Sequence, residues 1–352
     1  MPAPPPPRGR GAAGNPPNRF DRLHVELDVP EQDEDAPRQV KTEFLRDATR
    51  SALSRNGSPD IPFDYSLNPY RGCEHGCSYC YARPTHEYLG FSPGLDFETK
   101  IVVKHDAPRL LSAAFQKPSW TPQVVSVSGA TDPYQPVERR LRLTRACLEV
   151  FLRHRNPVSI ITKNALVTRD LDLLRELAAL DLVHVRLSIT SLRDDVIGAM
   201  EPRTSRPAAR LRAVEALAAA GVPVAVHAAP LVPGLTDEEL PAIYQAAASA
   251  GAHSAGFMVL RLPGAVGQLF PAWLRRHFPD RYDKVMGRLT EVRGGRLDEG
   301  RFHERFRLHG PWAEALRQVA RGAARRHGLD RPLPPLATHH FRRLAKGQMD
   351  LF

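Results

Sequence analysis

Short apolar runs alternate with longer amphipathic segments over most of the chain from Ile61 onward. The apolar runs predict six strands, at residues 63–67, 124–127, 158–162, 183–188, 222–227 and 255–260. The segments between them predict helices near residues 107–116, 138–154, 170–180, 205–220 and 237–250. A strand and a helix repeated about every 30 residues are typical of parallel strands joined by right-handed crossovers. The pattern therefore predicts an α/β fold.

Six strand–helix units fit either a doubly wound sheet or a barrel with fewer strands than the usual eight. Both architectures place the chemistry at the carboxyl ends of the strands. No G-x-G-x-x-G sequence follows the first strand, which disfavours the dinucleotide-binding version. Helix starts are indicated by Pro108, by Ser205 with Pro207, and by the predicted capping box Thr236–Glu239.

Outside the alternating region, which spans residues 61–264, the composition changes. Residues 1–20 are rich in Pro, Gly and Ala and are expected to be disordered. Residues 21–60 form a predicted N-terminal extension with a short helical pattern near residues 43–53. Residues 265–336 predict a basic, mainly helical extension, and residues 337–352 a tail.

The composition is that of a globular protein: of 352 residues, 42% are hydrophobic and 25% charged. No apolar run approaches the roughly 20 residues that span a membrane, and the first residues contain no secretory apolar region. Only 4 cysteines occur, and three of them fall within eight residues, which favours a metal site over disulfides. We therefore expect a cytoplasmic protein.

The net charge of +10 is concentrated near the C-terminus. Residues 265–352 hold 18 Lys and Arg against 9 Asp and Glu, whereas residues 1–264 are almost neutral. A basic segment joined to a neutral domain favours a polyanionic partner, most simply nucleic acid. The alternative is a set of arginine-rich, solvated helices, which are common in proteins from GC-rich genomes.

The cysteines Cys73, Cys77 and Cys80 have the spacing C-x3-C-x2-C and follow the first predicted strand. Three thiolates in one loop can bind three irons of a [4Fe–4S] cluster and leave the fourth iron for a small molecule. A structural zinc site would require a fourth protein ligand. Cys147 lies at helical spacing with apolar residues, so we interpret it as a core residue.

This motif, with the aromatic Tyr79 before its last cysteine, resembles the radical S-adenosylmethionine (radical SAM) superfamily over about residues 61–262. The resemblance implies a partial (β/α)6 TIM-type barrel with the cluster loop after the first strand. It also implies a [4Fe–4S] cluster whose open iron chelates the amino and carboxylate groups of S-adenosylmethionine. Reductive cleavage would give methionine and a 5′-deoxyadenosyl radical that abstracts hydrogen, with electrons from an external donor.

Given that resemblance, residues at the strand ends are candidates for cofactor binding, although each also fits an ordinary capped strand end. Gly129 would permit close backbone approach, and Thr131 and Asp132 would receive the ammonium group. Lys163 would pair with the methionine carboxylate, and Ser188 would bind the ribose. The candidates for contact with adenine are Gly234 and Met258.

Within the superfamily the chain is similar to the spore-photoproduct-lyase-like branch, which is associated with DNA repair. The shared features are N-P-Y-x-G-C before the cluster, Tyr81 after it, and strand ends reading Thr-Lys and Arg-x-Ser. The hydrogen-returning cysteine of that branch aligns with Gly129, so the repair reaction itself is in doubt. Tyr134 is a candidate replacement as hydrogen donor.

The last five residues, Gln348–Phe352, are similar to the peptide with which bacterial polymerases and repair proteins bind the sliding clamp. A flexible tail after the Pro-rich linker Arg331–Pro335 would present two apolar anchors and one amide to a pocket. The alternative is that Leu351 and Phe352 pack on their own domain.

The leading hypothesis is a radical SAM enzyme, lyase-like, that acts on nucleic acid. A second hypothesis keeps the radical chemistry but makes the substrate a protein or peptide. A third is a non-catalytic iron–sulfur or zinc module that binds DNA. Salt-dependent DNA affinity separates the first from the second, and cleavage of S-adenosylmethionine separates both from the third.

Overall fold

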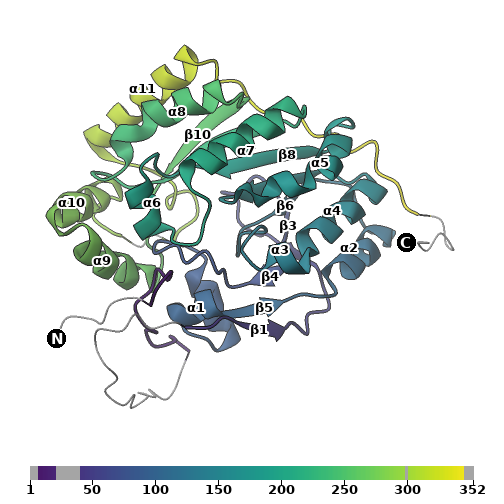
Figure 1. Cartoon of the computed structure of the whole chain (residues 1–352), viewed down its shortest axis with the longest axis horizontal. Coiled ribbons are helices and arrows are strands. Elements are labelled where there is room, and N and C mark those ends of the chain that lie inside the picture. Colours follow the sequence, from purple (N-terminus) through teal and green to yellow (C-terminus); the bar gives the residue numbers. More distant parts are fainter. Residues whose placement is uncertain (1–6, 21–39, 298–299, 345–352) are drawn as a thin grey trace.

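The structure is a computed structural model that describes residues 7–20, 40–297 and 300–344 (Figure 1). Its core is a seven-stranded sheet in the order β10-β9-β8-β7-β6-β3-β2. All neighbouring strands are parallel except β2, which runs antiparallel to β3 at one edge. The strands of this sheet are β2 (Leu53–Arg55), β3 (Tyr65–Leu67), β6 (Val125–Val127), β7 (Val158–Thr162), β8 (Val183–Ser188), β9 (Val224–Leu231) and β10 (Ser254–Val259).

The strand order decides between the two predicted architectures. A doubly wound sheet reverses its strand order at a switch point, whereas β3 and β6 to β10 follow one another in chain order without reversal. All the crossovers therefore turn the same way, and the sheet curls into the predicted partial TIM-type barrel. The six parallel strands confirm the six that the sequence predicts.

Helices cover the outer face of the sheet (Figure 1). Helices near 107–116, 205–220 and 237–250 agree with the sequence-based expectation. The helices are α1 (Leu95–Thr99), α2 (Ala107–Gln116), α3 (Glu138–Leu141), α4 (Leu143–His154), α5 (Leu171–Ala178), α6 (Asp194–Met200), α7 (Pro207–Ala219), α8 (Leu240–Ser249), α9 (Val266–His277), α10 (Tyr282–Val292) and α11 (Gly310–Arg326).

The two faces of the sheet differ in polarity. Residues such as Val185 and Val226 point to the helices and are fully buried. The alternate positions, which form the inner face of the barrel, are polar or small, as with Ser159, Arg186 and His227. Parallel strands buried on both faces are usually apolar throughout. The alternation therefore marks the inner face as the surface available for chemistry.

A second, three-stranded sheet lies below the first and was missed by the sequence analysis. It contains β1 (Glu43–Arg46), β5 (Lys100–Val103) and β4 (Tyr70–Arg71) in the order β1-β5-β4. The helical expectation for residues 43–53 was wrong, because β1 pairs in parallel with β5 and β2 pairs with β3. Pairing with strands distant in sequence overrides local helical preference.

Two expected helix features also differ. The predicted helix 138–154 is interrupted at Arg142, which has a φ of 53°, and the Glu138 carboxylate accepts a hydrogen bond from Thr144 N, at the start of α4. The predicted capping box Thr236–Glu239 does not form. The Thr236 hydroxyl accepts a hydrogen bond from Val232 N, and the Glu239 carboxylate accepts one from Leu192 N.

Residues 7–20, which we name the N-terminal strap, are packed on the domain rather than disordered as expected. The guanidinium of Arg10 donates to the backbone oxygen of Glu98 at 2.8 Å. The amides of Gly11 and Ala12 donate to the Glu98 carboxylate at 3.0 and 2.9 Å. A buried carboxylate that needs hydrogen-bond donors thus holds a segment whose composition alone indicates disorder.

Residues 329–344, which we name the C-terminal strap, run along the amino ends of the barrel strands (Figure 1, yellow). Leu329 O accepts from Ala255 N on β10, and Ala337 N donates to Asp181 O just before β8. The strap continues to His154 and ends near α2, where Gln116 donates to Leu344 O. The linker Arg331–Pro335 is therefore docked on the domain and is not a free tether.

The predicted clamp-binding peptide, Gln348–Phe352, lies outside the described residues. Within the described part of the chain, no helix is long and apolar enough to cross a membrane.

Candidate active site

The cysteine loop, residues 73–80, lies at the carboxyl end of β3, between the main sheet and the small sheet. The amide of Cys73 donates to Phe97 O at 2.8 Å. Gly72 before it has a φ of +78°, and a Cβ there would come within 2.9 Å of Phe97 O. Glycine is therefore required for the chain to enter the loop in this position.

The three thiols are clustered and shielded from water. Cys73 and Cys77 are buried, and Cys73 packs with Cys80 against Phe97. Burial raises the pKa of the Cys77 thiol well above its usual range and that of Cys80 to about 11, and the neighbouring thiols add to both shifts. Without a bound metal the sulfurs of Cys77 and Cys80 are therefore neutral thiols, and metal binding must displace their protons.

The donor set fits an iron–sulfur cluster. Three cysteines within one loop supply soft sulfur ligands. Among the residues that the structure describes, no three His, Cys, Asp or Glu side chains converge on a single ion. The fit to a cluster therefore rests on the sulfur chemistry of the three cysteines. Cys147 is buried in the apolar core, as expected, and takes no part.

A buried ion pair between Arg83 and Glu98 holds one side of the loop. Both side chains are fully buried, and their atoms Nη2 and Oε1 are 2.5 Å apart. Arg83 also donates to Cys77 O at 2.8 Å. The same carboxylate accepts from the amides of Gly11 at Oε2 and Ala12 at Oε1, so the N-terminal strap and the cysteine loop share one anchor.

Glu201 holds the other side of the loop. Its fully buried carboxylate accepts hydrogen bonds from Tyr79 in the cysteine loop and from Arg210 on α7. It also accepts from Thr190 after β8 at 2.6 Å and lies 3.0 Å from the ammonium of Lys163. Burial opposes its ionisation, but the charges of Arg210 and Lys163 outweigh burial and keep the pKa of Glu201 well below its usual range.

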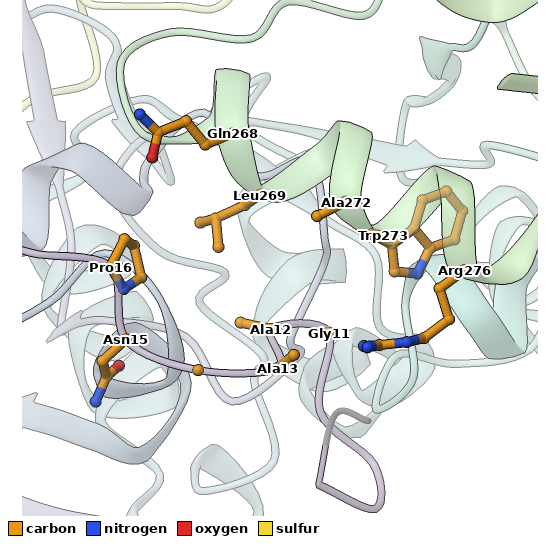
Figure 2. Close-up of a pocket in the computed structure, with 11 residues that line it drawn as sticks. Gly11, Ala12, Ala13, Asn15, Pro16, Gln268, Leu269, Ala272, Trp273 and Arg276 are labelled. Atoms are coloured by element: carbon orange, nitrogen blue, oxygen red, sulfur yellow. The ribbon is translucent and has the colours of Figure 1, made fainter. Parts of the chain in front are cut away.

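The strap packs directly on the cysteine loop, because a Cβ on Gly11 would overlap Gly76 O. Between the strap and α9 lies a groove of about 290 Å³. Figure 2 shows Leu269 and Ala272 of α9 facing Ala12 and Ala13 of the strap across this groove. The strap therefore forms a thin wall between the groove and the cysteine loop.

His75, inside the cysteine loop, was not singled out by the sequence analysis. Its Nδ1 lies 3.5 Å from an oxygen of Asp132, and its Nε2 lies 3.1 Å from Nδ2 of Asn164. Burial lowers the pKa of His75, but Asp132 and the nearby Cys73 outweigh it and raise the pKa to about 10. The ring therefore joins the cysteine loop to the ends of β6 and β7.

Several predicted cofactor residues turn out to build the site. The Thr131 hydroxyl donates to Gly72 O at 2.6 Å, just before Cys73. The Asp132 carboxylate accepts from the Thr162 hydroxyl at 2.7 Å and the Lys163 amide at 2.8 Å. Burial opposes its ionisation, but the charge of His75 keeps the pKa of Asp132 below its usual range. These side chains join the ends of β6 and β7 to the cysteine loop.

The other candidates at the strand ends have different surroundings. Gly129 has a φ of +114° and open space where a Cβ would be. The Lys163 ammonium donates to Ala229 O at 2.8 Å. Ser188 is buried and its backbone oxygen accepts from Arg210 at 2.8 Å. Gly234 has a φ of +82° and faces Lys284 of α10, whereas Met258 is 46% exposed.

Tyr134 is not positioned as a hydrogen donor. It is fully buried, and its hydroxyl donates to Asp170 Oδ2 at 3.1 Å. Burial and the Asp170 charge raise the pKa of Tyr134 well above its usual range. The hydroxyl is thus bonded to the buried carboxylate of Asp170, just before α5, which argues against the hydrogen-donor role expected from the sequence.

The partial barrel, with a three-cysteine loop after its first parallel strand, is the arrangement that identifies the class of this enzyme. The model of the radical SAM superfamily matches residues 67–247, and the chain belongs to that superfamily. An uncharacterized protein of Mycobacterium tuberculosis is 39% identical over 234 residues, covering 66% of this chain and 69% of the relative. An uncharacterized protein of Methanocaldococcus jannaschii is 29% identical over 175 residues, covering 50% of this chain and 63% of that one.

Among solved structures, spore photoproduct lyase superimposes with a TM-score of 0.57 at 18% identity, covering 81% of this chain and 79% of the lyase. A variant of the same lyase with bound AdoMet and dinucleoside spore photoproduct gives a TM-score of 0.56 at 19% identity, covering 81% of this chain and 78% of the lyase. At this identity the likeness establishes the fold.

Gly11→Ala tests the contact between the strap and the cysteine loop. The added methyl group overlaps Gly76 O, so the strap must move away and uncover the loop. We expect the variant to bind less iron and sulfide per chain after anaerobic reconstitution and to lose iron faster to a chelator. Gly14→Ala is the matched control, because no heavy atom lies within 4 Å of a Cβ there. Equal iron retention by wild type and Gly11→Ala would contradict the contact.

Glu201→Gln tests the buried carboxylate. The change leaves the buried guanidinium of Arg210 without its counter-charge, so we expect the free energy of unfolding to fall by about 3–5 kcal/mol. The measurement is chemical denaturation followed by circular dichroism. The exposed Glu314→Gln on α11 is the control and should leave the denaturation midpoint unchanged.

The same carboxylate predicts an acid limit to stability. Because the folded pKa of Glu201 is depressed, its contribution is complete above its unfolded pKa, near 4.5, and is lost as the pH falls further. We expect the Tm of the wild type to fall more steeply below pH 4.5 than the Tm of Glu201→Gln. Parallel curves would exclude Glu201 as the cause.

Proposed function

We propose that this radical SAM enzyme acts on nucleic acid, in a reaction related to the repair of photochemical damage. The observation that carries the proposal is the match to spore photoproduct lyase over 81% of the chain, which extends beyond the barrel common to the superfamily. The matching structures include the lyase with dinucleoside spore photoproduct bound. The basic residues beyond the barrel support the same substrate class, because a polyanion requires positive charge around the site.

Cys73, Cys77 and Cys80 are the residues that would hold the [4Fe–4S] cluster. When bound and reduced by an external donor, the cluster supplies an electron that cleaves S-adenosylmethionine and generates a radical. The chain's own part is to exclude water and to fix the loop. Arg83 and Glu98 do so from one side and Glu201 from the other.

The predicted S-adenosylmethionine residues divide into two groups under this proposal. Thr131 and Asp132 act indirectly, because their polar atoms already bond to the cysteine loop and to β7. Gly129 and Lys163 lie at the strand ends nearest the loop and would contact the cofactor. The ammonium of Lys163 lies 5.6 Å from the centre of the Tyr79 ring, within reach of a carboxylate bound beside the loop. Ser188, Gly234 and Met258 remain proposed contacts on the far side of the barrel.

The step that returns hydrogen to the substrate differs from that of the lyase branch that the chain resembles. Gly129 supplies no thiol at the aligned position, and Tyr134 is buried against Asp170. We therefore propose that the reaction ends differently from that of the lyase, with a substrate radical that is not quenched by a residue at the end of β6.

Production of 5′-deoxyadenosine tests the proposed function. The reconstituted protein, reduced with S-adenosylmethionine, should release 5′-deoxyadenosine, and UV-irradiated DNA should increase the yield over undamaged DNA. Cys73→Ala, Cys77→Ala and Cys80→Ala should abolish the release because each removes a cluster ligand. Cys147→Ala is the matched control and should retain it.

A yield unaffected by DNA but increased by a protein substrate would replace the proposal with peptide modification. Absence of 5′-deoxyadenosine together with one tightly bound zinc would leave a DNA-binding module.

We also propose that the C-terminal residues Gln348–Phe352 bind a sliding clamp. The proposal is supported by the docked C-terminal strap, which fixes the chain as far as Leu344, eight residues before Phe352. Leu351 and Phe352 would be the apolar anchors.

Leu351→Ala combined with Phe352→Ala should reduce binding to purified bacterial sliding clamp by at least tenfold, because it removes both anchors. Surface plasmon resonance with immobilised clamp is the measurement. Replacement of Met349 by Ala is the control and should change binding little. Equal affinity of the double variant and the wild type would exclude the tail as the clamp ligand.

A further inference from the structure

Arg186, in the middle of β8, is half-buried and differs in its partners from Arg83 and Arg210, which are fully buried. Arg83 and Arg210 each pair with a buried carboxylate. Arg186 instead donates from Nη1 to one hydroxyl, Ser159 Oγ, at 2.5 Å. Within residues 7–20, 40–297 and 300–344, no carboxylate lies within ion-pair distance of it. A guanidinium that loses water without a counter-ion is costly, and burial accordingly lowers the pKa of Arg186.

Other polar groups on the inner face lie at the level of this guanidinium. The strand register aligns Ser126 on β6 with Ser159 on β7 and with His184 on β8. All three are buried, and Nε2 of His184 has no hydrogen-bond partner. Burial and the charge of Arg186 lower the pKa of His184 to about 4, so its ring is neutral and adds no competing positive charge.

The strands on the other side of Arg186 carry small residues at the matching level. Ala225 on β9 is in register with Arg186, and Ser254 on β10 is in register with Ala225. One rung further along, His227 is in register with Gly256. At the rung of the Arg186 backbone, β9 and β10 therefore place only small side chains beside the arginine, whose guanidinium reaches back to the rung of Ser159.

We infer that Arg186, with Ser159, forms an oxyanion-binding site on the inner face of the barrel that takes a phosphodiester of the substrate. A guanidinium matches two phosphate oxygens with parallel hydrogen bonds, and the Ser159 hydroxyl, which accepts from Arg186, keeps its own hydrogen to donate. The inference rests on the proposed nucleic-acid substrate. It adds that the enzyme binds the phosphodiester next to the lesion inside the barrel. Contacts of the basic outer surface with the rest of the nucleic acid would be separate from this site.

The test compares two ligands that differ in one phosphate: dinucleoside spore photoproduct and its phosphodiester-linked dinucleotide. Binding to the anaerobic, cluster-loaded protein is measured by calorimetry at constant ionic strength. We expect the wild type to bind the dinucleotide at least about tenfold more tightly, as for a charge-assisted hydrogen bond. Arg186→Met should bind both ligands equally, and Arg186→Lys should recover part of the preference. Arg212→Met, an exposed change on α7 with the same loss of charge, should retain it.

A second measurement keeps the inference separate from the proposed function. Inorganic phosphate should raise the Tm of the wild type and of Arg212→Met but not of Arg186→Met. If neither dinucleotide nor dinucleoside binds while this phosphate effect persists, the oxyanion site stands and the nucleic-acid substrate is wrong. If wild type and Arg186→Met show the same phosphate effect and the same ligand preference, the inference is overturned.

Discussion

The carboxylate of Glu201 is the interaction on which the arrangement of the site depends. It joins the cysteine loop through Tyr79, the end of β7 through Lys163, and α7 through Arg210. These elements come from distant parts of the chain, and apolar packing alone fixes their distance better than their orientation. A single buried charge with several donors fixes both, because each donor must stay aligned to keep the charge compensated.

The sheet is divided into an apolar outer face, which stabilises the fold, and a polar inner face, which is left for the site. Since the helices and the outer-face valines supply the hydrophobic stabilisation, the inner face need not be filled with packed aliphatic residues. Polar side chains there depend on each other or on a ligand for their hydrogen bonds. Asp132 and His75 satisfy one another, whereas Arg186 and His184 retain unused hydrogen-bonding capacity.

Much of the fold could be predicted from the sequence because its signals are local. Strand–helix alternation gave the six barrel strands, and cysteine spacing gave the loop. The contacts that hold the loop could not be predicted, since Tyr79 and Glu201 lie 122 positions apart and Gly11 and Glu98 lie 87 apart. No sequence spacing marks a single glutamate such as Glu201 as a buried residue that binds the cysteine loop. The small sheet was missed for a similar reason, because β1 pairs with a strand more than 50 positions away.

The two straps lie at opposite ends of the barrel. The N-terminal strap rests on the cysteine loop, at the carboxyl ends of the strands, whereas the C-terminal strap follows their amino ends as far as Leu344. A proteolytic cut next to Leu344 would therefore act on the side of the domain away from the cysteines. A cut within residues 7–20 would instead open the wall of the site.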